Sequence, residues 1–228
     1  HHSYEINYID GFSILHKLLK NFDEPIGDSA IIPSFFLSEK AKEHKIKVML
    51  SGAGGDEIFS GYRRYFKTLR DILSGSINFI PNNININIAK LGLHNFSNTG
   101  FLLSNSTAAY CMSTSGMNLG VMSSLFNKDI IQSTIENFNN YKEFKNKSSL
   151  ENFSFHRMKF DINNYLVNDI LSLTDKASML NSIEVRVPFL DHRLVELIFS
   201  NIDKFKNLKN LSHSKIFLKK ILNDVLPK

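Results

Sequence analysis

The sequence predicts an α/β fold that becomes mostly helical after about residue 60. Two short β-rich stretches, YEINYI (4–9) and IKVML (46–50), are separated by segments in which apolar residues recur at helical spacing. Alternating strands and helices indicate a parallel sheet with helical crossovers. Because two strands cannot bury a sheet, either strand partners are missing from this chain or further strands escape the pattern.

Two helices are predicted between these strands. The segment 12–22 brings four aliphatic residues onto one helical face, namely Ile14, Leu15, Leu18 and Leu19. A loop follows over 23–33. Pro33 suits the first turn of a helix that continues over 34–44, because proline fixes a helical φ and its missing N–H is not needed there. The segment 46–50 is then predicted to be a short buried strand, because it is apolar and contains β-branched residues.

The chain from about residue 62 onward has a helical pattern with two interruptions. The asparagine-rich piece NNININIAKLGLHNFSNTG (82–100) is typical of a loop or a divergent insertion. The stretch 155–200 predicts helix, turn and helix, followed by a break at VRVPFLD (185–191). Asp191 then caps a new helix that ends near residue 200.

Composition excludes several classes of protein. The 228 residues, 43% of them hydrophobic, suffice for one large domain or two small ones. The net charge of +5 arises mostly from residues 203–220, which we interpret as a solvated helical face because no RNA-binding signature accompanies it. No apolar run approaches the roughly 18 residues of a membrane span, and no signal-peptide pattern opens the chain.

Cysteine and histidine usage narrows the chemistry further. Cys111 is the only cysteine, which excludes an intrachain disulfide and any multi-cysteine metal site, and suits a reducing cytoplasm. We expect Cys111 to be a small buried apolar residue. The eight histidines show no metal-ligand spacing.

The stretch LSGAGGDEIFSGYRRY (50–65) carries the strongest local signal. A strand that ends in a glycine turn and opens a helix is a common way to bind a polyanion, because glycine lets the backbone approach the ligand closely. Asp56 and Glu57 fall in the first turn of the following helix, where they complement the helix dipole or hold a cation. The alternative interpretation is a tight turn with an acidic helix start.

Four stretches together resemble the asparagine synthetase family. LSGAGGDEIFSGYRRY resembles its LSGxGxDExFxGYxxY segment, and DKASMLNSIEVRVPFLDHRLVE (175–196) resembles its DRxSMxxxxExRxPFLDxxLVE segment. SKIFLKKILNDVLPK (214–228) is similar to its TKxxLRxxxxxxLP segment, and 23–50 matches the approach to the glycine turn. The resemblance covers 1–75 and 155–228, whereas about 80–150 matches by position only.

The resemblance implies part of the C-terminal synthetase domain of that family, with an ATP-pyrophosphatase fold (adenine nucleotide α-hydrolase-like, Rossmann-like). Residues 1–75 would form the nucleotide-site part, 76–154 a divergent helical part and 155–228 a helical substrate-side part. The family's N-terminal glutaminase domain and its SGGxDS pyrophosphate loop are expected to be absent from this chain.

The resemblance also implies an activity. The family uses ATP to convert aspartate to a β-aspartyl-AMP intermediate, and ammonia from glutamine then displaces AMP to give asparagine. ATP and Mg²⁺ are the expected cofactors, and the partners are small molecules rather than nucleic acid or membrane, with a homodimer left open. Two alternatives remain, namely adenylation of another carboxylate, and an inactive partial domain that serves only in binding.

Site residues follow from the matching motifs. The resemblance implies nucleotide contacts for the turn residues Leu50, Ser51, Gly52 and Gly54, and a Mg²⁺ ligand in Asp56. Gly54 and Gly55 also suit a purely conformational role. Lys215 resembles the family lysine that contacts the phosphates, and its alternative is one more solvated lysine.

Glu184 has two interpretations, a role at the reacting substrate and a structural ion pair with Arg186. Weaker substrate candidates are Asp28, Ser29, Asp175 and Lys176.

Three positions depart from the family. Ala53 stands where asparagine-forming members carry an acid proposed to deprotonate ammonia, and alanine does no acid–base chemistry. Lys176 replaces an arginine, and Leu173 replaces a basic residue.

Overall fold

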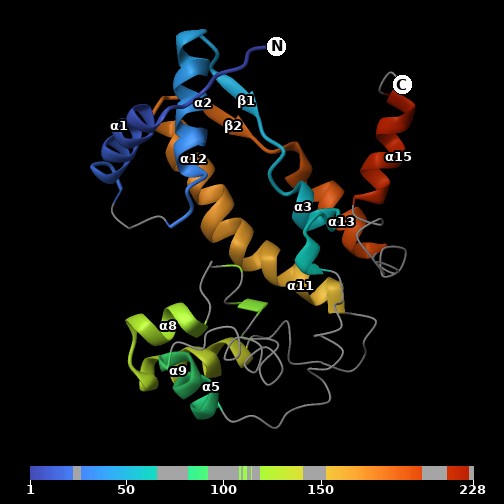
Figure 1. Cartoon of the computed structure of the whole chain (residues 1–228). Coiled ribbons are helices and arrows are strands. Elements are labelled where there is room, and N and C mark those ends of the chain that lie inside the picture. The colour runs from blue at the N-terminus through green and yellow to red at the C-terminus, as the bar shows by residue number, and fades with distance from the viewer. Residues whose placement is uncertain are drawn as a thin grey trace. The chain divides into compact units, whose positions relative to one another are not determined.

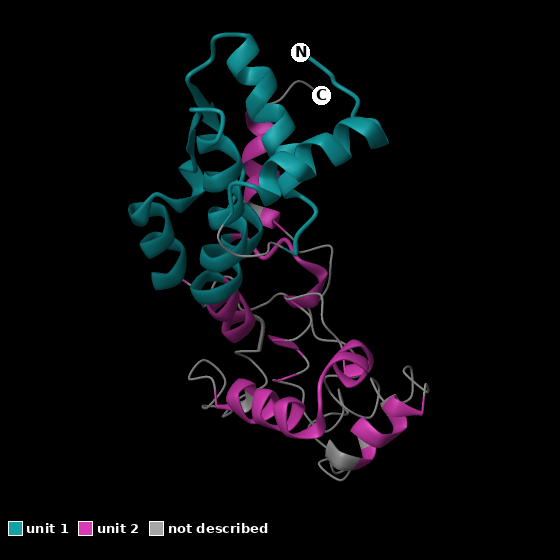
Figure 2. Cartoon of the chain, turned by 90° about the vertical axis from the view of Figure 1, so that its left-hand side faces the viewer, with its two compact units in different colours: residues 1–58, 162–200 teal, residues 59–161, 201–228 magenta. Residues whose placement is uncertain are grey.

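The structure is a computed structural model, and Figure 1 shows its helices and strands in order along the chain. It describes residues 1–22, 27–65, 82–91, 119–140, 153–201 and 215–225, together with 108, 110, 111 and 114. The chain divides into two compact units (Figure 2). The first unit comprises residues 1–58 and 162–200, and the second comprises 59–161 and 201–228. The three-part division expected from the sequence stays a prediction.

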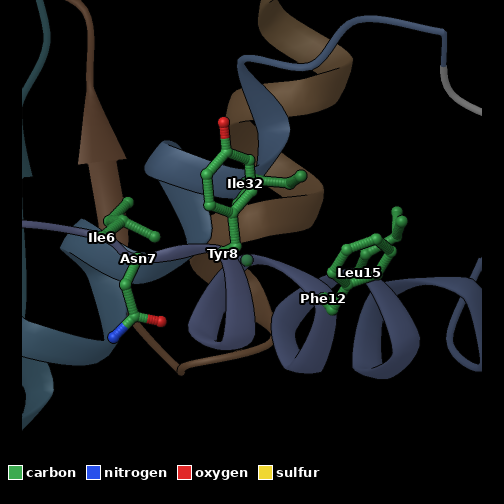
Figure 3. Close-up of a pocket in the computed structure, with 7 residues that line it drawn as sticks. Ile6, Asn7, Tyr8, Phe12, Leu15 and Ile32 are labelled. Atoms are coloured by element: carbon green, nitrogen blue, oxygen red, sulfur yellow. The ribbon is translucent and has the colours of Figure 1, made fainter.

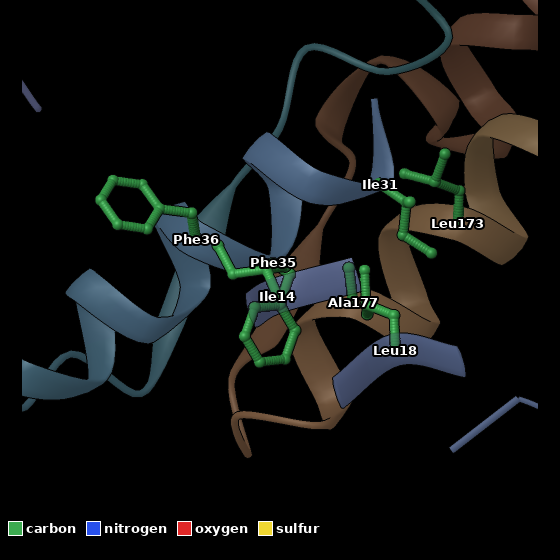
Figure 4. Close-up of a cluster of buried hydrophobic side chains, with 7 residues drawn as sticks. All are labelled: Ile14, Leu18, Ile31, Phe35, Phe36, Leu173 and Ala177. Carbon is green, nitrogen blue, oxygen red and sulfur yellow. The ribbon is translucent and has the colours of Figure 1, made fainter. Parts of the chain in front are cut away.

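The first unit is built around three helices, α1 (Tyr8–Leu19), α2 (Ile31–Glu43) and α12 (Ser172–Met179). Figure 4 shows that they share one apolar core, made of Ile14, Leu18, Ile31, Phe35, Phe36, Leu173 and Ala177. The two predicted helices are therefore confirmed, and Ile14 and Leu18 lie in the core as expected. Leu19 does not, because it faces solvent.

The strand predicted at 4–9 is wrong. Helix α1 already begins at Tyr8, because the side chain of Asn7 accepts a hydrogen bond from the Asp10 N–H at 2.9 Å and so caps the helix. Residues 1–7 have no regular secondary structure. The alternation of apolar and polar residues in YEINYI thus spans an irregular segment and the first turn of a helix.

A two-stranded parallel sheet joins distant parts of the sequence (Figure 1). Strand β1 (Val48–Leu50) pairs with β2 (Glu184–Arg186), with Met49 opposite Val185. The α/β class with parallel strands is confirmed, whereas β2 was not predicted and lies in a stretch expected to be helix and break. The predicted burial of the first strand is wrong, since Val48 is 40% and Leu50 73% exposed.

Helical segments flank the strands. The glycine turn leads into the one-turn helix α3 (Gly55–Ile58), and a 3₁₀ turn η1 (Arg63–Tyr65) follows. Helix α11 (Phe153–Asp161) continues through the π-helix η3 (Ile162–Leu171) into α12. The turn expected between two helices in this region is therefore wrong, because the chain stays helical there.

After β2 come the 3₁₀ turn η4 (Pro188–Leu190) and helix α13 (His192–Ser200). The predicted cap at Asp191 is confirmed. Its carboxylate accepts a hydrogen bond from the Arg193 N–H at 3.0 Å, and its carbonyl oxygen accepts one from the Leu194 N–H. The Arg193 side chain also binds this carboxylate and lowers the pKa of Asp191.

The second unit contains helices α5 (Asn82–Lys90), α8 (Leu119–Leu125), α9 (Lys128–Asn139) and α15 (Ile216–Val225). The first three share a core made of Ile86, Ala108, Leu119, Met122, Ile131 and Ile135. Two interpretations were open for 82–100, a loop and a divergent insertion. The loop is wrong over 82–90, where burial of Ile86 outweighs the low helix propensity of asparagine, and the divergent insertion stays a prediction. Residues 92–100 lie outside the described part.

Cys111 is buried, as predicted. Lys219 and Lys220 on α15 are exposed, which agrees with a solvated basic face, although 203–214 lie outside the described residues. Among the described helices, none combines the length and the apolarity that crossing a membrane requires.

A buried carboxylate organises the polar interior of the second unit. Asp161, at the end of α11, is 0% exposed and accepts hydrogen bonds from Arg64 Nε at 3.0 Å and Nη2 at 2.6 Å. The hydroxyls of Tyr65 and Tyr110 donate to it at 2.7 and 3.0 Å. Burial and the Asp161 charge raise the pKa of both phenols, so each remains a protonated donor. The motif residues Arg64 and Tyr65 are thereby fixed to α11.

The substitution Asp161→Asn should lower the free energy of unfolding by about 3 kcal/mol or more, because it removes the charge of Asp161 beside the largely buried Arg64 guanidinium. Equilibrium unfolding in urea measures this loss. Lys17→Gln, which breaks the exposed pair with Glu39, is the matched control and should cost less than about 1 kcal/mol. Equal losses in the two variants would show that Asp161 is not an organising group.

Candidate active site

The carboxyl ends of the two parallel strands lie side by side, and each leads directly into a turn. The Ser51 N–H donates to the Arg186 carbonyl oxygen at 2.8 Å, which extends the pairing of β1 and β2 by one step. Within the first turn, Ser51 Oγ accepts a hydrogen bond from the Ala53 N–H at 3.2 Å, and the Gly55 N–H donates to the Gly52 carbonyl oxygen. In parallel sheets this edge is where ligands usually bind.

Gly54 is required by the fold. Its φ of +86° lies in the left-handed region, and a Cβ built there would be 2.3 Å from Leu190 Cδ2. A Cβ on the neighbouring Gly55 would be 3.2 Å from the Phe189 ring. The turn after β1 therefore packs directly against η4, and these glycines allow the close approach of LSGAGGDE (50–57) and PFL (188–190).

Gly52 differs from Gly54. It is exposed, and a Cβ added to it would meet no atom of the protein within 4 Å. The fold thus has no steric need for glycine at this position. Beside it, Leu50 and Ser51 also lie at the end of β1, with Leu50 exposed and Ser51 half-buried.

Asp56 is half-buried in the first turn of α3, two residues after Gly54, which is the predicted position. Its carboxylate follows a glycine turn and suits Mg²⁺, which binds through one or two carboxylates together with phosphates and water. The described residues contain no group of three or more side chains that would hold a metal by themselves. A single carboxylate beside a glycine turn fits a metal that takes its other ligands from phosphate and water. The neighbouring Glu57 is buried.

Glu184 and Arg186 form the predicted ion pair, with Arg186 Nε 2.7 Å from Glu184 Oε1. Both side chains are on β2 and exposed to solvent. The hydrogen bond from Arg186 and its charge lower the pKa of Glu184. Glu184 is consequently a stable anion and a weak proton acceptor.

Asp28 lies in the loop before α2, where its carboxylate accepts a hydrogen bond from the Ala30 N–H at 2.8 Å. The adjacent Ser29 is exposed. Burial and the charge of Asp28 raise the pKa of Asp169, on the π-helix η3. The sequence analysis missed Asp169, because a local sequence pattern does not reveal that it lies near the charge of Asp28. A π-helix also has no sequence signature, although such helices often occur at functional positions.

The remaining candidates lie on other elements. Asp175 and Lys176 are on α12, where Asp175 is exposed and Lys176 Nζ lies 5.5 Å from the centroid of the Phe22 ring. Lys215 belongs to the second unit, unlike the other candidates. It is half-buried, has a positive φ of 52° and donates its N–H to the Phe59 carbonyl oxygen at 3.1 Å.

An apolar groove of about 360 Å³ lies along α1 (Figure 3). Its lining residues are uncharged and come from the N-terminal segment, α1 and α2, namely Ile6, Asn7, Tyr8, Gly11, Phe12, Leu15 and Ile32. None of the candidate site residues lines it. A groove without charge does not suit a nucleotide, so we place the candidate site at the strand ends.

Comparison with known proteins identifies the family. A family model described as asparagine synthase matches residues 1–228, and the chain therefore belongs to the asparagine synthase family. No solved structure matched the chain.

Several relatives carry the same name. "Asparagine synthetase [glutamine-hydrolyzing] 1" of Bacillus subtilis is 30% identical over 225 residues, which cover 93% of this chain and 33% of the relative. A putative asparagine synthetase of Mycobacterium tuberculosis is 30% identical over 190 residues, 78% of this chain and 27% of the relative. This chain thus spans about a third or less of the length of the relatives it matches.

The two glycines allow a matched test of the turn. Gly54→Ala should lower the free energy of unfolding by about 2 kcal/mol or more, since it adds both a clash with Leu190 and an unfavourable φ. Gly52→Ala should change it by less than about 0.5 kcal/mol. Urea unfolding measures both, and adding Leu190→Ala to Gly54→Ala should relieve only the clash. A loss at position 52 equal to that at 54 would contradict this division.

Asp169 should make stability depend on pH. A raised pKa means that the folded state holds the proton more tightly than the unfolded state. The contribution of Asp169 to the free energy of unfolding is therefore lost as pH rises from about 4 through its folded-state pKa. Asp169→Asn should therefore gain thermal stability relative to wild type as pH rises from 4 to 7. Glu184→Gln should show the opposite sign in a lower window, below pH 4.5, because the pKa of Glu184 is lowered from that value and wild type loses its contribution as pH falls. Parallel melting-temperature profiles for Asp169→Asn and wild type would contradict the prediction.

Proposed function

We propose that the protein containing this chain is an ATP-dependent ligase that converts aspartate to asparagine. In this reaction the aspartate β-carboxylate attacks the α-phosphorus of ATP, which gives β-aspartyl-AMP and releases pyrophosphate. Ammonia then attacks the acyl carbon, and AMP leaves. The family membership and the names of the relatives support this activity.

The pairing of β1 with β2 is the observation that carries the proposal. It brings the turn that follows Leu50 and the turn that follows Arg186 to one edge of a parallel sheet, with Leu190 against Gly54. Turns at the carboxyl ends of parallel strands form ligand sites in α/β proteins. An ATP-pyrophosphatase-like fold would use this edge for its nucleotide.

The residues of the glycine turn have distinct proposed roles. Leu50, Ser51 and Gly52 would contact the AMP part of the nucleotide, where the absence of a Cβ at Gly52 permits close approach. Gly54 acts through the shape of the turn. Asp56 would hold Mg²⁺, which neutralises charge on the phosphates when bound.

Lys215 is the proposed cation for the leaving phosphates. A positioned ammonium group beside developing negative charge contributes roughly 10² to 10³ in rate in sites of this kind. Glu184 would act as an anion held by Arg186 at the edge of the sheet rather than as a proton acceptor, because its pKa is lowered. The proposed substrate-binding residues are Asp28, Ser29, Asp175 and Lys176. We propose Asp169 as a further one, because the charge of Asp28 contributes to its raised pKa.

Ala53 favours a second candidate function. Its methyl group is half-buried in the glycine turn, and it offers no group that could deprotonate ammonia. A protein that adenylates a different carboxylate would retain the nucleotide turn and dispense with this acid. In either reaction we propose glutamine as the nitrogen source, the cytoplasm as the location and a homodimer as the assembly.

The protein containing this chain should catalyse exchange of pyrophosphate into ATP when Mg²⁺ and aspartate are present. Exchange that requires aspartate supports asparagine formation. Exchange that requires another acid instead supports the second function. Formation of ADP rather than AMP would contradict both. A fourth outcome, no binding of Mg·ATP at micromolar concentration, would indicate a partial domain without catalytic activity.

Asp56→Asn should lower the exchange rate by at least about 10²-fold and weaken the dependence on Mg²⁺, because an amide is a poorer ligand than a carboxylate. Asp10→Asn is the matched control, since Asp10 also occupies the first turn of a helix but lies on α1. It should leave the exchange rate unchanged. Equal rates for Asp56→Asn and wild type would remove Asp56 from the site.

A further inference from the structure

Lys215 is held by its backbone on both sides. Its N–H donates to the Phe59 carbonyl oxygen at 3.1 Å, and its own carbonyl oxygen accepts the Lys219 N–H at 2.9 Å, which starts helix α15. Its positive φ of 52° is uncommon for a residue with a side chain and costs about 1 kcal/mol or more. The Lys215 side chain therefore leaves the backbone from a fixed point and in a fixed direction.

The partner of this hydrogen bond is itself fixed by an unusual turn. Ser60 has a φ of +59°, and this dihedral orients the peptide that contains the Phe59 carbonyl. Phe59 and Ser60 are both buried, Ser60 to 2% exposure. In the described part of the chain, Ser60 Oγ is buried without a hydrogen-bond partner.

Ser60 is thus a costly residue at its position. A left-handed backbone and an unsatisfied buried hydroxyl each lower the stability of the folded state. Glycine would avoid both penalties, and a β-branched residue would increase the first. This turn orients the Phe59 carbonyl group, which accepts the hydrogen bond from the Lys215 N–H.

We propose that the left-handed turn at Phe59–Ser60 is a positioning element for Lys215. The inference deepens the proposed function and rests on it, because the value of a fixed Lys215 depends on the role of its ammonium group. Phe59 follows Asp56 by three residues in the sequence, so this hydrogen bond connects the segment after the glycine turn to the start of α15. Ser60 acts through Lys215 and need not touch the substrate.

Substitutions at Ser60 separate backbone geometry from side-chain chemistry. Ser60→Val should shift the peptide and lower kcat for pyrophosphate exchange by about 10- to 100-fold, with the KM for ATP changed by less than about 3-fold. Ser60→Gly keeps the left-handed turn and should retain wild-type activity. If Ser60→Val does not fold, Ser60→Leu, which lacks the β-branch, takes its place.

A double-mutant cycle tests whether the effect passes through Lys215. In the Lys215→Ala background, Ser60→Val should lower kcat by less than about 3-fold, because the group it positions is gone. Ser182→Val is the matched control. Ser182 has the same φ of +59° but lies in the first unit, so its effect should multiply with that of Lys215→Ala. If the effects of Ser60→Val and Lys215→Ala also multiply, the positioning role is wrong.

Amide hydrogen exchange supplies a readout that does not need activity. The Lys215 amide should be protected in wild type and in Ser60→Gly, and should lose protection in Ser60→Val. If no acid supports pyrophosphate exchange, the proposed function is wrong. Hydrogen exchange at the Lys215 amide would still test the positioning element in that case. Unchanged protection of Lys215 in Ser60→Val would overturn the positioning element even in an active protein.

Discussion

The parallel pairing of β1 with β2 is the contact on which the candidate site depends. It spans three residue pairs, yet it joins two segments that are more than a hundred residues apart in the sequence. Because the strands run in the same direction, the turns that follow them emerge at the same edge. The close approach of Leu190 to Gly54 and of Phe189 to Gly55 follows from that register. A slip of one residue would move Asp56 and Glu184 to other positions relative to each other.

The two units use polar groups in different ways. In the first unit, the ion pair of Glu184 with Arg186 is exposed, where solvent screens it and the carboxylate stays accessible. In the second unit, Asp161 is fully buried, and its hydrogen bonds to Arg64, Tyr65 and Tyr110 compensate for the loss of hydration. The first arrangement suits an encounter with small charged molecules. The second fixes the backbone that follows the glycine turn.

The sequence predicted the helices with a clear apolar face, the strand β1 and the Asp191 cap, because each depends on local spacing or capping chemistry. The sequence-based predictions were wrong where tertiary contacts determine the secondary structure. Asn7 caps a helix that interrupts the strand pattern at 4–9, and Ile86 draws an asparagine-rich segment into a helical core. Strand β2 was missed because three residues carry too little periodicity. For the candidate site, the motifs indicated Asp56, which stays a prediction, and the ion pair, which the structure contains, whereas Asp169 and the Phe59–Lys215 contact required the fold.

The contrast between Gly52 and Gly54 has a consequence for the divergence of related sequences. Position 54 is constrained by the turn itself, so a descendant that had lost its chemistry would still retain glycine there. Position 52 has no such constraint within the protein, and any selection on it would come from what the turn binds. Substitution at 52 with glycine kept at 54 would therefore mark a lineage that retains the fold after abandoning the ligand.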